Sequence, residues 1–324
     1  MHARQTLDGL MDEPLIACLI QQSERDLIVL VATATEVFSL QETEPESILS
    51  GEPAALIEDI EGPVIVTRSG RIAFPGKETE SHIDHPIECA ERAGADLLIG
   101  TEGPHIYRHT SGTTEKVETF DQLECRDTFH TPWGSPASVR SFASTCGGVV
   151  YADIHVGSVM RSPDSGAHWE PVTPDLHEDV HQVATTGAAP DRLYANTAHG
   201  VYLSDDRGGS WTHRLTGFPY LYGRAVAVHP EDPECALASV SRGPHGNPAG
   251  QLYRTDDAGT SWRHVTNGYP DTVDRNIDTF QIGFSNDGRS WATAADGLYV
   301  SEDRGQAWDP FWTAPNDITL IACN

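Results

Sequence analysis

Lysine is almost absent from this sequence. Of the 21 basic residues among 324, only Lys77 and Lys116 are lysines, so 19 are arginines. The 48 acidic residues bring the formal net charge to −27. So acidic a chain repels the phosphate backbone of nucleic acids and the headgroups of anionic lipids. Binding of nucleic acid or of a membrane through bulk charge is therefore excluded.

Scarce lysine combined with high negative charge is typical of proteins adapted to concentrated salt. Repulsion among the acidic groups destabilises the compact state in dilute buffer, and molar salt screens it within about 3 Å. We therefore expect an acidic protein from a halophilic organism. An ordinary acidic protein from a low-salt organism is the alternative.

Long apolar runs and paired cysteines are also missing. No stretch approaches the roughly 18 apolar residues of a membrane-spanning helix. Residues 1–14 contain three acidic side chains and lack the pattern of a signal peptide. The sequence therefore predicts a cytoplasmic protein with reduced thiols. The six cysteines stand singly, at Cys18, Cys89, Cys125, Cys146, Cys235 and Cys323.

The sequence does contain a motif repeated four times, Ser/Thr-x-Asp-x-Gly-x-x-Trp, at 162–169, 204–211, 255–262 and 301–308. Its Asp can accept hydrogen bonds from turn amides, its Gly supplies a positive φ, and its Trp fills space between neighbouring sheets. We predict structural roles for Asp164, Gly166, Trp169, Asp206, Gly208, Trp211, Asp257, Gly259, Trp262, Asp303, Gly305 and Trp308.

Short apolar segments surround each motif, such as 193–197 and 200–204 before the second one. Successive motif aspartates lie 42 to 51 residues apart, which matches a blade of four short antiparallel strands. The first half lacks the motif but keeps the strand rhythm. The sequence thus predicts an all-β chain, with residues 1–324 forming a single domain, a seven-bladed β-propeller of four-stranded antiparallel blades.

The motif resembles the Asp-box, or BNR repeat, of sialidases, Vps10-type receptors and photosystem II assembly factors, within the superfamily of WD40, YVTN and BNR-like propellers. This resemblance implies the fold. Sialidases also carry an early Arg-Ile-Pro motif, where this chain has Arg71-Ile72-Ala73. A typical sialidase activity is therefore not expected.

Ring closure has two candidate strands. Residues 318–323 and residues 15–20 both resemble the innermost strand of the first blade. Either segment satisfies the pattern, and the sequence leaves both open.

Aligned blades indicate a functional rim opposite the Asp-boxes. Equivalent positions before the inner strands of the fifth, sixth and seventh blades hold His181, Arg224 and Asp278. A base, a guanidinium and a carboxylate at one mouth suit acid–base chemistry or anion recognition. A merely solvated rim is the alternative. Four residues earlier in the same blades stand His177, Tyr220 and Asp274.

Histidines recur on the same expected rim. The hairpins between second and third strands carry His105, His155, His199 and His245, and the outer connections add His82, His85 and His130. Neutral imidazoles suit transition metals. A transition-metal cofactor with His177, His181 and His199 as ligands is therefore one expectation, and polar solvation of the hairpins is its alternative.

Residues 177–181 also match the zinc-protease motif H-E-x-x-H. That motif needs a helix, which places both imidazoles on one face with the glutamate as base. The blade alignment instead puts Val183 in an inner strand. The protease interpretation is therefore disfavoured.

The predicted function is a cytoplasmic binding or assembly scaffold that binds a protein or a small ligand at the rim. The expected ligand-binding residues are His105, His155, His177, His199, Tyr220, Tyr222 and His245. The alternative is a glycosidase-like or metal-assisted hydrolase or lyase at the same rim, with catalytic candidates His181, Arg224, Asp278, Asp274 and Glu178 and a further carboxylate at Asp296. A scaffold predicts a shallow surface with exposed aromatic residues such as Trp133, whereas an enzyme predicts an inward cleft.

Overall fold

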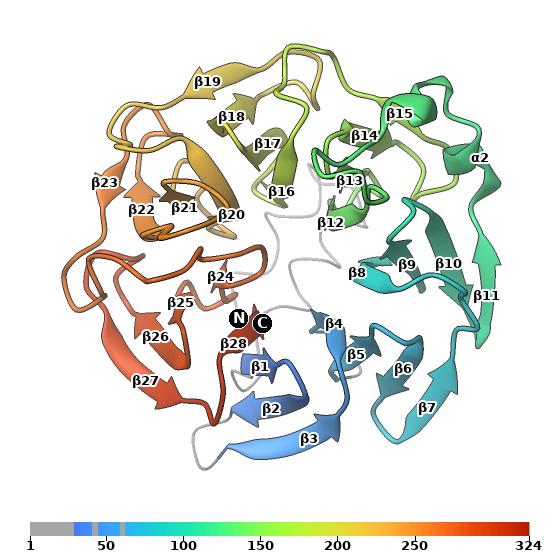
Figure 1. The fold of residues 1–324 in the computed structure, drawn as a ribbon, viewed down its shortest axis with the longest axis horizontal. Coiled ribbons are helices and arrows are strands. Elements are labelled where there is room, and N and C mark those ends of the chain that lie inside the picture. Colours follow the sequence, from blue (N-terminus) through green and yellow to red (C-terminus); the bar gives the residue numbers. More distant parts are fainter. Residues whose placement is uncertain (1–28, 41–44, 59–61, 324) are drawn as a thin grey trace, which may run out of the picture.

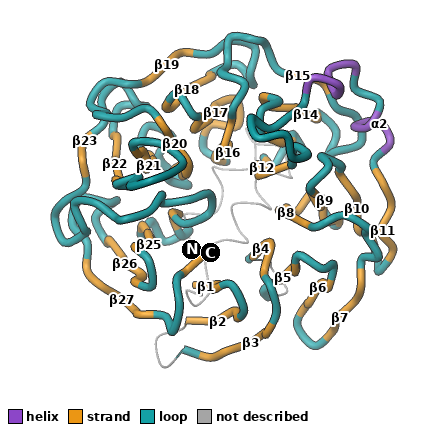
Figure 2. The backbone as a smooth tube through the Cα atoms, in the orientation of Figure 1, coloured by secondary structure: helices purple, strands orange, loops and turns teal. Residues whose placement is uncertain are grey.

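The computed structural model describes residues 29–40, 45–58 and 62–323. These residues form seven four-stranded antiparallel sheets, arranged as the blades of a ring around a central axis (Figure 1). Strands and loops make up nearly all of the described chain, and the short helices α2 (Glu118–Asp121) and η1 (Glu124–Thr128) lie between the third and fourth blades (Figure 2). The predicted seven-bladed β-propeller is confirmed.

Each blade runs from an innermost to an outermost strand. The first blade holds β28 (Ile318–Cys323), β1 (Val29–Thr33), β2 (Glu36–Leu40) and β3 (Glu46–Ser50). The second and third hold β4 (Pro53–Ile57), β5 (Val64–Thr67), β6 (Arg71–Phe74), β7 (Lys77–Glu80), β8 (Ile87–Ala93), β9 (Asp96–Thr101), β10 (Ile106–Thr110) and β11 (Thr113–Lys116).

The remaining four blades follow the same order. The fourth and fifth hold β12 (Val139–Ser144), β13 (Val150–Ile154), β14 (Ser158–Ser162), β15 (Glu170–Pro171), β16 (Val180–Thr186), β17 (Ala189–Thr197), β18 (Gly200–Ser204) and β19 (Thr212–Arg214). The sixth and seventh hold β20 (Tyr222–Val228), β21 (Ala236–Ser241), β22 (Gln251–Thr255), β23 (Arg263–His264), β24 (Ile282–Phe284), β25 (Ser290–Ala294), β26 (Gly297–Ser301) and β27 (Asp309–Thr313).

The C-terminal strand closes the ring. β28 pairs antiparallel with β1, with Val31 opposite Ile321, so the first blade combines both ends of the described chain (Figure 1). This pairing covers the strand edges that an open sheet would expose. Of the two candidate closing segments, 318–323 is therefore the one that pairs here, and 15–20 lies outside the described residues.

The core lies between neighbouring blades. Leu98 of the third blade packs in one buried cluster with Val139 and Trp169 of the fourth, and the other blade interfaces are filled in the same way. Because both faces of each sheet are covered by neighbouring sheets, the middle strands are largely buried; all five residues of β13 are buried, Asp153 among them. This packing holds the strand ends at fixed positions around the channel.

The four Asp-boxes form the turns between third and fourth strands. In the second box the Ser204 hydroxyl accepts a hydrogen bond from the Gly208 amide (2.8 Å), and Asp206 accepts one from the Ser210 amide (2.7 Å). Gly208 has φ 82°, and a Cβ there would lie 2.6 Å from Val172. The other three boxes repeat these contacts at 2.8 to 2.9 Å. The hydroxyl and the carboxylate of each box are thus used inside the turn itself.

The cysteines differ in part from the prediction. Cys89, Cys125, Cys235 and Cys323 are free thiols, as predicted. Cys146 is disulfide-bonded, so the prediction of reduced thiols is wrong for that residue, because spacing along the chain does not limit which thiols meet in the fold. Within the described ranges, neither short helix has the length or hydropathy needed to cross a membrane.

Candidate functional site

A β-bulge recurs near the start of the innermost strands. The residues at the bulges have no opposite residue on the second strand. They are Glu88 in β8, Arg140 in β12, His181 in β16 and the pair Arg224–Ala225 in β20. A bulge bends the strand and re-aims the extra side chain. We call this rim, where the inner strands begin and the second-to-third hairpins emerge, the mouth. The bulges place ionisable side chains around it at equivalent positions.

Two arginines converge on one carboxylate across the mouth. Arg140 Nη2 lies 3.5 Å and Arg224 Nη1 lies 3.6 Å from Oδ1 of Asp278. Burial alone would raise the pKa of Asp278, but the charges of Arg224 and Arg140 outweigh it and lower that pKa. The guanidinium of Arg224 also lies over the ring of Tyr222, 5.4 Å from its centroid. Asp278 is therefore held as a carboxylate between two cations.

The segment that carries Asp278 reaches far across the ring. The Thr279 hydroxyl donates to the carbonyl of His181 in the fifth blade (2.9 Å), and the Phe280 amide donates to the Gln182 side chain (3.4 Å). The Phe280 carbonyl accepts from the Ile321 amide of the first blade (2.8 Å). Residues 278–281 thus connect blades on opposite sides, and the mouth lies over this crossing segment.

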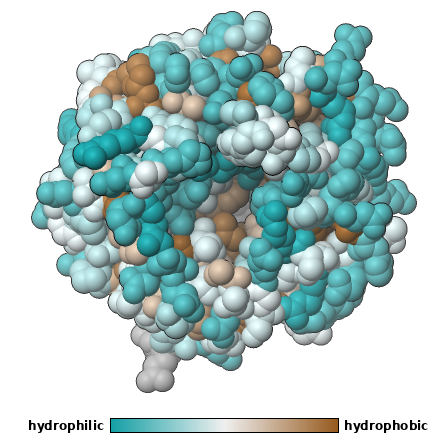
Figure 3. All heavy atoms as spheres, viewed as in Figure 1, coloured by the Kyte–Doolittle hydropathy of each residue, from teal (hydrophilic) through white to brown (hydrophobic). Residues whose placement is uncertain are grey.

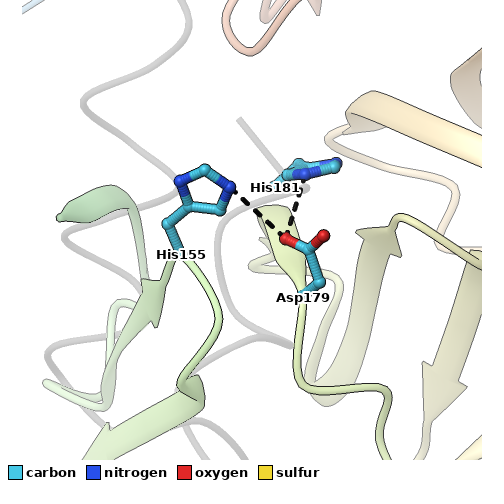
Figure 4. A group of neighbouring side chains, drawn as sticks. All are labelled: His155, Asp179 and His181. Carbon is cyan, nitrogen blue, oxygen red and sulfur yellow. Dashed lines mark ion pairs between the residues drawn. The ribbon is translucent and has the colours of Figure 1, made fainter. Parts of the chain in front are cut away.

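A second group joins two histidines to an aspartate (Figure 4). Asp179 Oδ1 lies 3.2 Å from His181 Nε2 and 3.5 Å from His155 Nε2. His155 comes from the hairpin between β13 and β14, and Asp179 directly precedes β16. The His181 side chain is 0% exposed, and its Nδ1 lies 2.5 Å from the Gly223 carbonyl. Together with Arg140, Tyr222, Arg224 and Asp278, these three residues form what we call the mouth cluster.

Burial and the arginines shift the ionisation of this group. Burial, followed by the charge of Arg140, lowers the pKa of His155 to about 4. Burial also lowers the pKa of His181. Burial opposes ionisation of Asp179, but the hydrogen-bonding contact and charge of His181 prevail and lower its pKa. Both carboxylates of the mouth cluster therefore favour the ionised form.

The loop before β16 is held by both neighbouring hairpins. The carbonyl of Glu178 accepts from the amides of Gly157 (3.0 Å) and Ser158 (2.9 Å), and the carbonyl of Asp179 accepts from Ala198 (2.9 Å). Residues 177–181 are therefore loop and the start of a strand, with no helix. Because the zinc-protease motif requires a helix, the structure excludes that interpretation of H-E-x-x-H.

Other predicted rim residues lie apart from the mouth cluster. His177 and His199 stack on each other with ring centroids 4.3 Å apart. Tyr220 accepts a hydrogen bond from Arg242 (3.1 Å), and Asp274 is 80% exposed beside Arg275. His105 pairs with Asp121 (2.8 Å) and lies near His85. Besides Asp274, the exposed residues of the predicted set include His82, His130, Glu178, His199, His245 and Asp296.

The structure thus brings together His181, Arg224, Asp278, Tyr222 and His155 from the predicted set. It adds Arg140 and Asp179, which the sequence analysis missed. Extending the blade alignment to the fourth blade would have found Arg140, because it stands at the same bulge as His181. Asp179 lies in a loop and carries no such periodic signal.

The expected metal ligands are not the ones that meet. Among the described residues, the group whose potential ligand atoms all lie within 4.8 Å of one another is His155, Asp179 and His181. His177 and His199 are not part of it. The mouth therefore offers two imidazoles and one carboxylate instead of three imidazoles.

Two open cavities lie away from the mouth. Cavities of about 400 and 360 Å³ are lined by residues such as Phe74 and His109, and Asp191 and Arg192, near the rim of the Asp-boxes. The face in Figure 3 is hollowed at the centre of the ring and bordered mainly by hydrophilic residues. Trp133, 61% exposed, lies beside the His155 ring at 5.0 Å. The mouth cluster thus meets solvent next to an exposed aromatic side chain.

Comparison with known proteins agrees with the architecture. The Sortilin-Vps10 family model (sortilin, neurotensin receptor 3) matches residues 157–269, which include three of the Asp-boxes. A xyloglucanase of Hypocrea jecorina (strain QM6a) is 27% identical over 189 residues, 54% of this chain and 21% of the xyloglucanase. This chain therefore spans about a fifth of that relative.

Two solved structures are similar in fold. An ancestral GH74 enzyme superimposes with a TM-score of 0.61 at 14% identity, covering 91% of this chain and 40% of the enzyme. YCF48 bound to a D1 peptide superimposes with a TM-score of 0.50 at 15% identity, covering 72% of this chain and 68% of YCF48. These structures show the similarity of the fold. The four Asp-boxes and the match of residues 157–269 to the Sortilin-Vps10 model support a propeller of the BNR, Vps10-like type.

Proposed function

We propose that this propeller is a binding scaffold whose mouth cluster recognises an anionic group, such as a carboxylate, on a protein partner. The observation that carries the proposal is the convergence of Arg140 and Arg224 on Asp278 in a chain with a net charge of −27. Arginines held together in an acidic protein supply a local site for an anion where the rest of the surface repels it.

The arginines keep donors for a ligand. Their contacts with Asp278, at 3.5 and 3.6 Å, are longer than the roughly 2.7–2.9 Å of charge-assisted hydrogen bonds. Arg224 Nε is buried and has no hydrogen-bond partner among the described residues. A bound carboxylate would satisfy such donors.

A protein partner suits the surroundings of the mouth. Trp133 and Leu221 are exposed, and large exposed apolar side chains beside charged groups are typical of interaction sites. The crossing segment 278–281 lies beneath the mouth and is held by hydrogen bonds to the fifth and first blades. YCF48 has a propeller of similar fold and is bound to a peptide, which supports this class of partner.

The test is a peptide array in which each sequence carries either acidic residues or their amides. We expect the protein to prefer the acidic member of each pair. The Arg140→Gln/Arg224→Gln double variant should lose about 100- to 10,000-fold in affinity, because charge-assisted hydrogen bonds contribute roughly 1.5–3 kcal/mol each. The matched control is Arg263→Gln, an exposed arginine paired with Asp256 outside the mouth. Equal binding of acidic and amide peptides would contradict the proposal.

A glycosidase is the second candidate, because the xyloglucanase and the GH74 enzyme share the fold. Glycoside hydrolysis needs one carboxylic acid with a raised pKa beside a second, ionised carboxylate. Asp278 and Asp179 both have lowered pKa values. Burial raises the pKa of Asp153 to about 7, but Asp153 is fully buried against Ser141. Release of reducing ends from xyloglucan, lost on Asp278→Asn, would favour this candidate over the scaffold.

We also propose that the protein works as one propeller unit in the cytoplasm of a halophile. The support is the net charge of −27 with two lysines. Since salt screens the repulsion among acidic groups, the melting temperature should rise steadily as potassium chloride increases from dilute to molar concentrations. A melting temperature that does not change with salt would favour the ordinary acidic protein.

A further inference from the structure

We propose that His155, Asp179 and His181 form a binding site for a divalent transition metal ion of the zinc type. The three side chains come from the hairpin of the fourth blade and the inner strand of the fifth, and they point toward one another (Figure 4). This proposal concerns the metal alone and does not depend on the anionic ligand proposed above.

The distances from the aspartate to the two histidines fit tetrahedral coordination. Zinc binds imidazole nitrogen and carboxylate oxygen at roughly 2.0–2.2 Å, which places two ligands of a tetrahedron about 3.3 Å apart. Asp179 Oδ1 lies 3.2 Å from one Nε2 and 3.5 Å from the other. Three protein ligands with a fourth position left for water or a ligand are the usual arrangement of a reactive zinc site.

The hydrogen bonds of His181 leave a bare nitrogen at the site. The Gly223 carbonyl can only accept, so Nδ1 of His181 carries the hydrogen that it donates. In the neutral ring Nε2 then presents a lone pair toward Asp179. A backbone carbonyl bonded to the far nitrogen is also what commonly orients a metal-binding histidine.

Neither partner of this close contact is satisfied. Within the part of the chain that the structure describes, His181 Nε2 and Asp179 Oδ1 are buried without a hydrogen bond, although they lie 3.2 Å apart. A neutral imidazole nitrogen and a carboxylate oxygen that face each other repel unless a proton or a metal cation lies between them. A metal ion satisfies both atoms at once.

The hairpin that presents His155 is strained. Val156 has φ 50° and Ser158 has φ 67°, and a β-branched residue in this region costs of order 1–3 kcal/mol. The Glu178 carbonyl holds the hairpin through the amides of Gly157 and Ser158. The strained turn is thus tied to the loop that carries Asp179, which keeps the His155 ring near the other two ligands.

Charges around the site do not prevent cation binding. Arg140 and Arg224 oppose a cation at His155, but both lie beside the Asp278 carboxylate, which offsets their charge. The net charge of −27 also attracts cations to the protein as a whole.

The experiment is calorimetric titration of chelator-treated full-length protein with zinc chloride, at high salt. We expect one zinc ion per chain and a higher melting temperature in the zinc-loaded protein. Asp179→Asn and His155→Gln should each weaken zinc binding at least about 100-fold, more than loss of a supporting group does. Both variants preserve side-chain size, and circular dichroism checks that they fold. X-ray absorption should place nitrogen and oxygen ligands about 2.0–2.1 Å from the zinc.

The matched control is His199→Gln, which removes an imidazole of the stacked pair and leaves the proposed ligands intact. Its affinity for zinc should equal that of the unmodified protein. The proposal is overturned if the unmodified protein takes up no zinc at a one-to-one ratio. It is also overturned if folded Asp179→Asn binds zinc unchanged, or if His199→Gln loses the ion.

Discussion

The two rims of the ring use polar residues in opposite ways. In the Asp-boxes, the Ser or Thr hydroxyl and the Asp carboxylate bond to amides two to four residues away, as Ser204 and Asp206 do. At the mouth, Arg224 Nε, His181 Nε2 and Asp179 Oδ1 are buried without a hydrogen bond among the described residues, whereas the four Asp-boxes have one such side-chain atom, Trp211 Nε1. Native proteins rarely leave buried polar atoms unsatisfied, so such atoms call for a ligand. We therefore expect the Asp-boxes to stabilise the ring and the mouth to bind the ligands proposed above.

The largest effect should come from removing an Asp-box tryptophan. Trp308 is 3% exposed, packs beside Tyr269 and donates from Nε1 to the Gly305 carbonyl (3.0 Å). Trp308→Ala should lower the free energy of unfolding by about 3–5 kcal/mol, because it leaves a cavity between blades. Urea denaturation measures this loss.

A tryptophan-to-alanine substitution at the mouth tests the difference between the rims in their contribution to stability. Trp133→Ala removes a tryptophan that is 61% exposed, so it should change stability by less than about 0.5 kcal/mol. Comparable losses in the two variants would mean that the rims do not differ in their structural contribution.

The fold was predictable because its strongest signals are local. The hydroxyl and carboxylate of an Asp-box bond to amides at most four positions away, so four copies appear directly in the sequence. Ring closure was open because the pairing of β28 with β1 joins the two ends of the ring. No local pattern decides between 318–323 and another apolar segment of similar length.

The mouth was predictable only in part. His181, Arg224 and Asp278 stand at repeating positions, and aligning blades was enough to group them. Thr279 bonds to His181 across 98 residues, and that contact follows from the path of the crossing segment. Asp179 meets His155 because two hairpins hold its loop. Such contacts depend on loop conformation, which has no periodicity.

An effect of intermediate size is expected at Glu91, on the innermost strand β8 between the two rims. Burial raises its pKa from 4.5 to about 7, although it accepts a hydrogen bond from the Ser144 hydroxyl (2.7 Å). Between about pH 4.5 and 7 the folded protein keeps this proton while the unfolded chain releases it. This side chain therefore makes the protein less stable as pH rises through that range, with no further change above it.

Glu91→Gln removes this titration. The variant should match the unmodified protein near pH 4.5 and exceed its stability by roughly 1–3 kcal/mol above pH 7. Denaturation at several pH values measures the difference. If the difference in stability between the two proteins stays constant with pH, then Glu91 has the same pKa in the folded and unfolded states. Its carboxylate would then be as well hydrogen-bonded as those of the Asp-boxes.

The smallest expected difference is the one between removing the Asp-box carboxylate Asp206 and removing the adjacent carboxylate Asp205. Asp206→Ala removes acceptors for the Ser210 amide and for the Ser204 and Ser210 hydroxyls, and by analogy with a lost helix cap it should cost about 1 kcal/mol. Asp205→Ala removes a carboxylate that is 60% exposed and pairs only at the surface with Arg192, so it should cost less than about 0.5 kcal/mol. Neither variant should alter peptide or zinc binding, since both carboxylates lie on the rim opposite the mouth. If Asp206→Ala instead lost ligand binding at an unchanged melting temperature, the Asp-boxes would be part of the binding surface, and the division of labour between the rims would be wrong.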